Sequence, residues 1–234
     1  MKLLDIPFND RRRRYLIFHP RRLPDRLALA STSTTEAFEE VGSSRFYTST
    51  DGAILAKVVP DKFSRRREPL KWLTRDYLEK RCLAQSDARK EYMSLRTLQR
   101  AGLRTPRCHG WGLSLNPANR NASLLLMEHI QGARMGGDVV FLQADEASRE
   151  RLLDQVADEV LKLAQAGYLH RDLHLNNLLV TAEHELVWVD AHLKPMPRAN
   201  NKRWPALKAT LSANKFYGEQ YRQRVEDRLK DAWR

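Results

Sequence analysis

Residues 168–190 constrain the fold of this chain more than any other stretch. Two apolar runs, 178–180 and 186–189, flank a short polar segment. A polar segment of this length reverses the chain, so the two runs are expected to pair as antiparallel strands. Asn177 begins the first run and Asp190 follows the second. The hairpin would therefore bring these two oxygen-bearing side chains side by side.

Asn177 and Asp190 carry oxygen atoms of the kind that bind Mg²⁺, which proteins commonly hold with one or two carboxylates together with substrate phosphates. Asp172 lies in the loop just before the hairpin, where its carboxylate can face an incoming hydroxyl group. The stretch therefore predicts a metal site at Asn177 and Asp190 and a catalytic carboxylate at Asp172. The alternative is that all three are ordinary residues of a loop and a strand end.

The spacing of polar residues in this stretch is that of a known catalytic loop. Four residues match the motif His-Arg-Asp-x-x-x-x-Asn of protein-kinase-like folds: His170, Arg171, Asp172 and Asn177. Asp190 stands where these folds place a second metal-binding residue, but Ala191 and His192 follow it in place of Phe and Gly. We therefore expect phosphoryl transfer without a switch based on that Phe, and we expect His170 to serve the structure of the loop.

The composition is that of a globular protein. Hydrophobic residues make up 42% of the 234 residues and aromatic residues 8%, which argues against a disordered chain. This length suits one sizeable domain or two small lobes. No apolar run is long enough to cross a bilayer and the first residues show no signal-peptide pattern, so we expect a cytoplasmic protein. Cys82 and Cys108 are expected to be reduced packing residues.

Positive charge is concentrated in three stretches. Residues 1–30 hold eight Lys or Arg against three acidic residues, 61–75 hold six against two, and 194–208 hold five against none. Such local surpluses predict an anionic partner in addition to ATP, and phospholipid headgroups, an acidic saccharide or nucleic acid would each fit. For residues 1–30 the alternative is a solvated basic face.

A β-hairpin is expected in the first half of the chain. Segments 45–50 and 53–59 are strand-like, and Asp51-Gly52 between them is a strong hairpin signal. Lys57 follows Ile54-Leu55-Ala56 in the second strand, as does the Lys that contacts the α- and β-phosphates of ATP in protein-kinase-like folds. The alternative is a Lys that protects an edge strand from pairing.

Gly42 and Ser43 precede this hairpin, in a turn that would cover the ATP phosphates with backbone N–H groups in a protein-kinase-like fold. One Gly is a weak match to the Gly-rich loop of those folds. The turn is nevertheless expected to bind the nucleotide.

Residues 84–101 are expected to form a helix that ends at Gly102. One face of this helix is apolar apart from a single carboxylate: Ala84, Ala88, Glu91, Leu95 and Leu98. A carboxylate that faces a core is costly unless a cation pairs with it, and Lys57 is the expected partner. The alternatives are that Glu91 reaches solvent at the margin of the stripe, or that Glu79 pairs with Lys57 instead.

A strand at 123–130 is expected to join two lobes, and the backbone near Glu128 and Ile130 is expected to meet the adenine of ATP. Helices are expected at 146–166, 203–213 and 215–233. The chain after Asp190 is too short for a long activation loop and the helices that dock peptides in protein kinases.

The order of these elements predicts an α+β, two-lobed protein-kinase-like fold. Residues 1–35 are expected to form a basic N-terminal segment, in which prolines interrupt any long helix. Residues 36–130 would form a small N-terminal lobe, with an antiparallel sheet and one helix that bind ATP. Residues 131–234 would form a reduced, mainly helical C-terminal lobe with the catalytic loop, the metal-binding Asp and the acceptor site.

The chain resembles the lipopolysaccharide core kinase family, the Kdo and WaaP-type sugar kinases, over residues 40–215. The resemblance rests on several motifs: the run 86–92 with Leu95, Leu98, 101–103 and 105–106 after it, Asp172-Leu173-His174 ahead of Asn177, and Arg203-Trp204 and Leu207 after Asp190. His174 favours a small-molecule acceptor, because many protein kinases have Lys at this position and small-molecule kinases of the superfamily often have His.

The resemblance implies ATP-dependent phosphorylation of a heptose or Kdo hydroxyl in the inner core of lipopolysaccharide, at the cytoplasmic face of the inner membrane. Asp172 would orient the hydroxyl and accept its proton, and Lys57, held by Glu91, would place the phosphates. Asn177 and Asp190 would hold Mg²⁺.

The anionic acceptor is expected to meet the basic stretch after Asp190. The residues expected to bind it are His174, Arg198, Lys202 and Arg203. Residues 1–30 and 61–75 are expected to rest against anionic lipid as a peripheral contact. No nucleic-acid partner is expected.

Two other functions stay open from the sequence. A protein Ser/Thr kinase is one, although the missing peptide-docking region argues against it. A non-catalytic kinase-like binding module with a basic surface is the other, although the presence of Lys57, Asp172, Asn177 and Asp190 together argues against it.

Overall fold

The computed structural model describes residues 1–8, 12–32, 35, 44–143 and 145–233. The chain divides into two compact units. The N-terminal unit comprises Met1–Met93 and Arg107–His129, and the C-terminal unit comprises Ser94–Pro106 and Ile130–Arg234.

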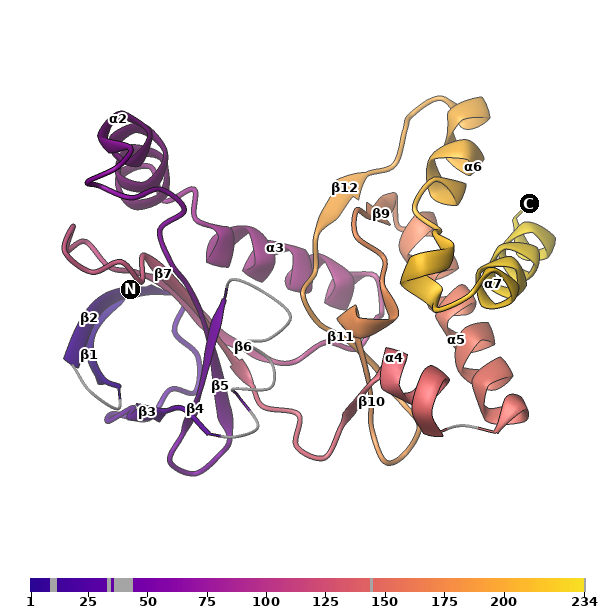
Figure 1. The fold of residues 1–234 in the computed structure, drawn as a ribbon, viewed down its shortest axis with the longest axis horizontal. Coiled ribbons are helices and arrows are strands. Elements are labelled where there is room, and N and C mark those ends of the chain that lie inside the picture. The colour runs from indigo at the N-terminus through magenta and orange to yellow at the C-terminus, as the bar shows by residue number, and fades with distance from the viewer. Residues whose placement is uncertain (9–11, 33–34, 36–43, 144, 234) are drawn as a thin grey trace. The chain divides into compact units, whose positions relative to one another are not determined.

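The N-terminal unit is built on one curled antiparallel sheet, whose strand order is β1-β2-β6-β7-β5-β4-β3 (Figure 1). Its strands are β1 (Lys2–Pro7), β2 (Arg12–Phe18), β3 (Leu29–Ala30), β4 (Arg45–Ser49), β5 (Ile54–Val59), β6 (Cys108–Leu113) and β7 (Ser123–Glu128). All neighbouring strands of this sheet are antiparallel. Strand β5 lies in the interior of the sheet, because it pairs with β4 on one side and with β7 on the other.

Residues 1–35, which we expected to form a separate basic segment, instead supply β1, β2 and β3 of this sheet. Alternate residues of β1 and β2 are apolar and buried, among them Ile6, Tyr15 and Ile17, so one face of each strand enters the core. The same core contains side chains from the other strands, such as Val58 and Leu126. The period-two pattern therefore places this segment in the sheet, and Arg12 and Arg14 of β2 occupy positions on the opposite face.

The hairpin expected around Asp51-Gly52 is confirmed as β4 and β5. Gly52 takes a left-handed backbone conformation with φ of 69°, which glycine adopts at little cost. The Asp51 carboxylate accepts hydrogen bonds from the Ser49 hydroxyl at 2.5 Å and from the Ala53 N–H at 3.1 Å. The turn is thus held by its own side chains.

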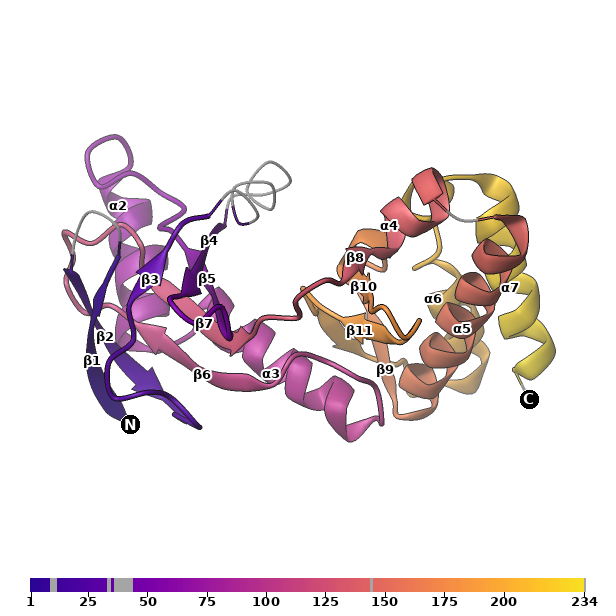
Figure 2. The same cartoon turned by 90° about the horizontal axis from the view of Figure 1, so that it is seen from below.

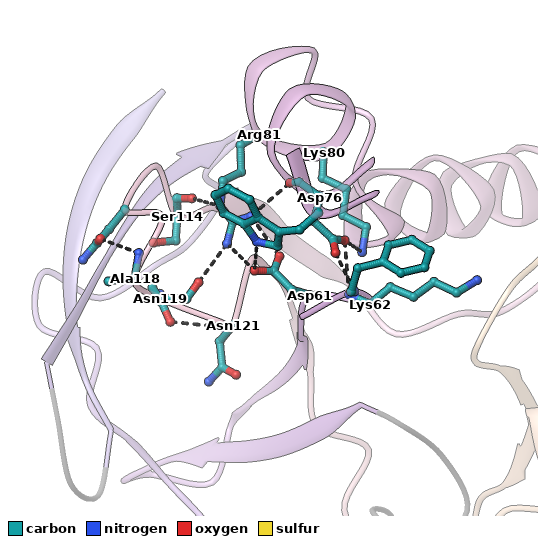
Figure 3. A network of polar contacts seen from close by, with 12 residues as sticks. Asp61, Lys62, Asp76, Lys80, Arg81, Ser114, Ala118, Asn119 and Asn121 are labelled. Carbon is teal, nitrogen blue, oxygen red and sulfur yellow. Dashed lines mark hydrogen bonds and ion pairs between the residues drawn. The ribbon is translucent and has the colours of Figure 1, made fainter. Parts of the chain in front are cut away.

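A buried polar network connects the segment after β5 with the following helix. Helix α2 (Pro69–Lys71) continues into the π-helical segment η1 (Trp72–Cys82). Arg81 of η1 makes two hydrogen bonds with the Asp61 carboxylate, at 2.8 and 3.0 Å, and also donates to the carbonyl oxygens of Ser114 and Asn119 (Figure 3). Because both charges are almost fully buried, these additional bonds offset the cost of removing them from water.

Helix α3 (Asp87–Arg100) begins three residues later than expected. Ala84 has φ of 55°, which breaks the helical path. Ser86 then caps the helix, since its hydroxyl accepts a hydrogen bond from the Arg89 N–H at 3.2 Å. The expected end at Gly102 is confirmed, with φ of 77°.

The C-terminal unit contains a small sheet of β11 (Leu186–Trp188), β10 (Leu178–Val180) and β8 (Arg134–Met135), and a strand pair of β12 (Leu193–Pro195) and β9 (Tyr168–His170). Its helical segments are α4 (Gly136–Asp138), η2 (Val139–Gln143), α5 (Glu146–Gln165), η3 (Leu175–Asn177), α6 (Asn200–Lys208), η4 (Ala213–Phe216) and α7 (Glu219–Ala232). This unit is mainly helical, as expected.

Helix α5 of the C-terminal unit matches the helix predicted at 146–166 closely. Asp145 caps its first turn by accepting a hydrogen bond from the Ser148 N–H at 2.8 Å. Helices α5 and α7 lie side by side (Figures 1 and 2), and two bidentate pairs, Arg224–Asp154 and Arg228–Asp158, connect them. No helix among the residues that the structure describes is long and apolar enough to cross a membrane.

The two last helices differ from the sequence prediction. The helix expected at 203–213 is α6 at Asn200–Lys208, and the helix expected at 215–233 begins only at Glu219. Tyr217 has φ of 60°, so the backbone leaves the helical path there, and the short turn η4 precedes it. Charge and apolar spacing alone did not reveal this break.

Candidate active site

The predicted ion pair between Lys57 and Glu91 is present in the N-terminal unit. The Lys57 Nζ lies 2.9 Å from one Glu91 carboxylate oxygen and 3.1 Å from the other. Lys57 is 8% exposed and Glu91 3% exposed, so Glu91 does not reach solvent at the margin of its helix. Glu79 is half-exposed and pairs with Arg75 instead. Lys57 lies on β5, an interior strand, rather than on an edge strand.

The predicted hairpin of the C-terminal unit is also confirmed. Strands β10 and β11 pair antiparallel, with Leu178 opposite Trp188. The ladder extends to the predicted metal ligand, because the Val189 N–H donates to the Asn177 carbonyl oxygen at 2.9 Å. Asp190 follows immediately, in a left-handed conformation with φ of 48°. The backbone therefore brings Asn177 and Asp190 to the same end of the hairpin.

Trp188 ties this hairpin to helix α5. Its side chain is fully buried, and its indole N–H donates to the Glu159 carboxylate at 2.5 Å. Burial raises the pKa of Glu159 above its usual range. The strand that ends at Asp190 is thus fixed against the longest helix of the unit.

The residues at this end of the hairpin fit a magnesium ion in their chemistry. The Asn177 side-chain nitrogen donates to the Asp172 carbonyl oxygen at 2.8 Å, which orients the amide and leaves its oxygen as the acceptor. The Asp190 side chain is 42% exposed. Within the described ranges no group of three or more His, Cys, Asp and Glu could hold a metal, so further ligands would come from phosphates and water.

Asp172 has a partner that the sequence did not suggest. The Lys215 ammonium group lies 2.7 Å from the Asp172 carboxylate, with side chains that are 29% and 59% exposed. This hydrogen-bonded cation lowers the pKa of Asp172 below its usual range. Asp172 is therefore ionised at neutral pH, with a positive charge beside it.

The turn that carries Lys215 is fastened to the catalytic loop. Phe216 is fully buried and anchors η4, and the Tyr217 hydroxyl donates to the Asn176 side-chain oxygen at 2.7 Å. Gly137 lies against both groups, and a Cβ on it would stand 2.6 Å from the Tyr217 hydroxyl oxygen. The sequence predicted a helix that starts at 215, so it did not reveal this turn. An apolar residue at position 216 is the one sequence feature consistent with it.

Two histidines of the catalytic loop, His174 and His170, contact neighbouring parts of the chain, and the expected role of His174 in binding an acceptor stays a prediction. The His174 Nδ1 accepts a hydrogen bond from the Asn176 N–H at 3.0 Å, and burial lowers the pKa of His174. His170 is 3% exposed and its ring lies 5.7 Å from that of Trp188. Burial lowers the pKa of His170 to about 4, so this side chain is neutral at physiological pH.

The two residues expected near the adenine, Glu128 and Ile130, lie at the end of β7 and just beyond it. Strand β7 ends at Glu128, whose carboxylate accepts a hydrogen bond from the Arg107 N–H at 3.1 Å. Ile130 lies just beyond the strand and is half-buried. Their contact with adenine stays a prediction. Gly42 and Ser43, which were expected to cover the phosphates, lie outside the described residues.

The basic stretch after Asp190 runs beside the strand that leads into the catalytic loop. Strand β12 pairs with β9, with Leu193 opposite His170. Arg198 and Lys202 are exposed and Arg203 is half-buried. Their role in binding an acceptor stays a prediction.

The comparisons with known proteins agree with this geometry. The model of the family described as "Lipopolysaccharide kinase (Kdo/WaaP) family" matches residues 38–215, whereas no curated protein matches the chain. A solved structure of WaaP in complex with acyl carrier protein has a TM-score of 0.51 and 18% identity, over 85% of this chain and 83% of that chain.

Two structures of WbdD, one of them described as a bifunctional kinase-methyltransferase, have TM-scores of 0.51 and 0.50, with 15% and 14% identity. They match 81% of this chain, but this chain spans only 42% and 43% of theirs. At these identities the likeness shows the fold alone, and it confirms the predicted α+β, protein-kinase-like fold. Because the family match covers most of its length, the chain belongs to the lipopolysaccharide kinase (Kdo/WaaP) family, whose members are ATP-dependent phosphotransferases of the lipopolysaccharide core.

Proposed function

We propose that this kinase transfers the γ-phosphate of ATP to a hydroxyl group of a heptose or Kdo in the lipopolysaccharide inner core. The observation that carries this proposal is the catalytic loop, in which an ionised Asp172 lies beside Lys215 and is hydrogen-bonded through its carbonyl oxygen to Asn177. The loop offers a carboxylate and an amide oxygen, and η4 adds a cation beside the carboxylate. Those are the groups that phosphoryl transfer requires.

Asp172 would act on the attacking group. Its carboxylate would accept a hydrogen bond from the sugar hydroxyl, orient the oxygen towards the γ-phosphorus atom and take the proton as the new P–O bond forms and the bond to the ADP oxygen breaks. The pKa of Asp172 is lowered by Lys215, so the carboxylate remains ionised over the whole neutral range. Its chief contribution is therefore orientation.

Two lysines would act on the transferred phosphate. Lys57 would contact the α- and β-phosphates, and Glu91 holds its ammonium group in place. Lys215 would stabilise the negative charge on the equatorial oxygens during transfer. In many protein kinases a Lys two residues after the catalytic Asp supplies such a charge, and here that position is His174, whose ring is occupied with the loop backbone.

Asn177 and Asp190 would hold Mg²⁺ through their side-chain oxygens. When bound, the metal ion would neutralise charge on the β- and γ-phosphates.

The acceptor would be held by positive charge on the segment that follows Asp190. Arg198, Lys202 and Arg203 would bind carboxylates and phosphates of the inner core. The basic residues of 1–30 and 61–75 would bring the enzyme to the anionic surface of the inner membrane. Charge reversal at these three residues is expected to raise the KM for the glycolipid and leave the KM for ATP unchanged. Equal KM values for the glycolipid would contradict the assignment.

The test of the proposed function is ATP turnover by the purified protein with Mg²⁺, with and without dephosphorylated inner-core lipopolysaccharide. Mass spectrometry of the glycan then shows whether a heptose or a Kdo has gained one phosphate. We expect this gain with the native chain and none with Asp172→Ala.

Other outcomes favour the alternatives. Phosphate on a protein and never on a glycolipid would indicate a protein kinase. ATP binding without turnover on any acceptor would indicate a non-catalytic binding module.

A further inference from the structure

A pocket of about 620 Å³ lies in the N-terminal unit, apart from the residues assigned to phosphoryl transfer. Four arginines line it: Arg12, Arg13, Arg45 and Arg120. They come from the start of β2, the start of β4 and the loop between β6 and β7. Residues far apart in the sequence therefore gather positive charge at one place.

The carboxylate of the lining does not balance this charge. Asp61 also borders the pocket, but both of its oxygens are bonded to Arg81, and one of them also accepts from the Trp72 indole N–H at 3.1 Å. None of the four lining arginines forms an ion pair with another residue in the described part of the chain. The lining thus keeps a surplus of positive charge.

Hydrogen-bond donors in the lining lack acceptors. Asn121 is 6% exposed, and its side-chain nitrogen has no hydrogen-bond partner among the described residues; the same holds for one terminal nitrogen of Arg13. The Asn121 side chain points away from the Asp61–Arg81 pair (Figure 3). Buried polar groups in folded proteins nearly always have partners, so two unsatisfied donors beside one pocket indicate a missing acceptor.

The side-chain oxygens of two other asparagines in the lining already accept hydrogen bonds. The side-chain oxygen of Asn119 accepts from the Asn121 N–H at 3.1 Å, and that of Asn116 accepts from the Ala118 N–H at 2.9 Å. A ligand for this pocket must therefore bring oxygen atoms that accept hydrogen bonds and must carry negative charge. A phosphate group meets both needs, because its oxygens accept paired hydrogen bonds from guanidinium groups.

We propose that this pocket binds a phosphate group, carried either by a soluble phosphate compound or by a lipid headgroup. Arg45 and Arg120 supply the exposed charge, and Asn121 and Arg13 supply the buried donors. This site is additional to the nucleotide and acceptor residues described above.

The test is a calorimetric titration of the full chain with inorganic phosphate, with ADP present in excess so that the nucleotide site is occupied. The variant Arg45→Gln/Arg120→Gln removes two exposed charges from the pocket, and the control variant Lys90→Gln/Arg100→Gln removes two exposed charges from helix α3. We expect the pocket variant to bind phosphate at least about tenfold more weakly and the control variant to bind it like the native chain.

A second arm identifies the source of the phosphate. Vesicles of phosphatidylcholine, with and without phosphatidic acid, are sedimented with the same three proteins. Retention that requires both phosphatidic acid and the pocket arginines indicates a lipid headgroup, and phosphate binding without such retention indicates a soluble compound. Equal binding by the pocket and control variants, or no binding of either probe by the native chain, would overturn the proposal.

Discussion

Each unit of this kinase has a pair of a lysine and a carboxylate among its candidate catalytic residues, and the two pairs have nearly the same separation but lie in opposite surroundings. In the N-terminal unit the Lys57–Glu91 separation is 2.9 Å, and both side chains are buried. In the C-terminal unit the Lys215–Asp172 separation is 2.7 Å, and the Asp172 side chain is 59% exposed. The same chemical pair can therefore perform two different tasks.

Burial decides which task each pair performs. Removing one partner from a buried pair leaves a charge without compensation, whereas an exposed pair contributes little to stability because water solvates both charges. Lys57 and Glu91 thus connect strand β5 to helix α3. Asp172 and Lys215 contribute little to the fold, and both groups stay accessible to reacting molecules.

The largest effect should follow from Asp172→Asn, which keeps the shape of the side chain and removes its negative charge. We expect phosphorylation of the lipopolysaccharide core to fall roughly 10²–10⁴-fold, because proton acceptance and orientation are lost. The free energy of unfolding, measured with urea, should change by less than about 1 kcal/mol. Full activity in this variant would contradict the catalytic assignment.

The buried pair should behave in the opposite way. Lys57→Met removes the ammonium group that lies beside the buried Glu91 carboxylate, so we expect the free energy of unfolding to drop by about 3–5 kcal/mol. The double variant Lys57→Met/Glu91→Leu should regain most of this stability. It should not regain activity, because the cation that contacts the phosphates is still absent.

Denaturation of the single and double variants checks the stability prediction, and ATP turnover by the double variant checks the catalytic one. If the double variant is as unstable as the single variant, an uncompensated charge on Glu91 is not the cause of the lost stability.

Lys215→Met tests whether the exposed pair acts on the transferred phosphate. We expect kcat to fall roughly 10²-fold, by analogy with the loss of one group that stabilises developing negative charge, and Lys215→Arg to restore part of it. An unchanged kcat would show that Lys215 does not stabilise the transferred phosphate.

The pH profile of the same variant gives an independent measurement. Lys215 holds the pKa of Asp172 below its usual range, so the native activity should persist to lower pH. Without Lys215 the pKa of Asp172 rises, and the acid limb of kcat/KM should move to higher pH.

The smallest effect concerns His170, a fully buried titratable group next to the exposed pair. Its pKa in the folded state is about 4, below the usual value near 6.5, so the unfolded chain binds a proton first as pH falls. From about pH 7 to about pH 5 this group should lower the free energy of unfolding by about 2 kcal/mol.

His170→Phe keeps a ring against Trp188 and removes the titration. The pH dependence of its unfolding free energy over this range should be weaker than that of the native chain, as measured by urea denaturation at both pH values. Identical pH dependence would show that His170 is not the group responsible.

The sequence predicted the local parts of the site well, because spacing fixes them. The hairpin that carries Asn177 and Asp190 follows from two short apolar runs and a polar turn, and the structure has the same strands. The pairing of Lys57 with Glu91 followed from a carboxylate in an apolar stripe, because such a group needs a cation.

The sequence predictions were wrong in two segments, for different reasons. Residues 1–35 were expected to stand apart because their arginines and prolines are conspicuous, yet their alternating apolar residues enter the sheet core. Lys215 was expected at the start of a helix, but the left-handed Tyr217 and the buried Phe216 place it on a turn.

By itself the sequence determined the catalytic motif, the type of fold and the family, since these depend on residue types at fixed spacing and on periodic burial. Only the tertiary structure decided which charge lies beside Asp172 and which arginines line one pocket. Those groups come from segments distant in the chain, such as Arg12 and Arg120 or Asp172 and Lys215. Their proximity results from packing of the core, which no local pattern encodes.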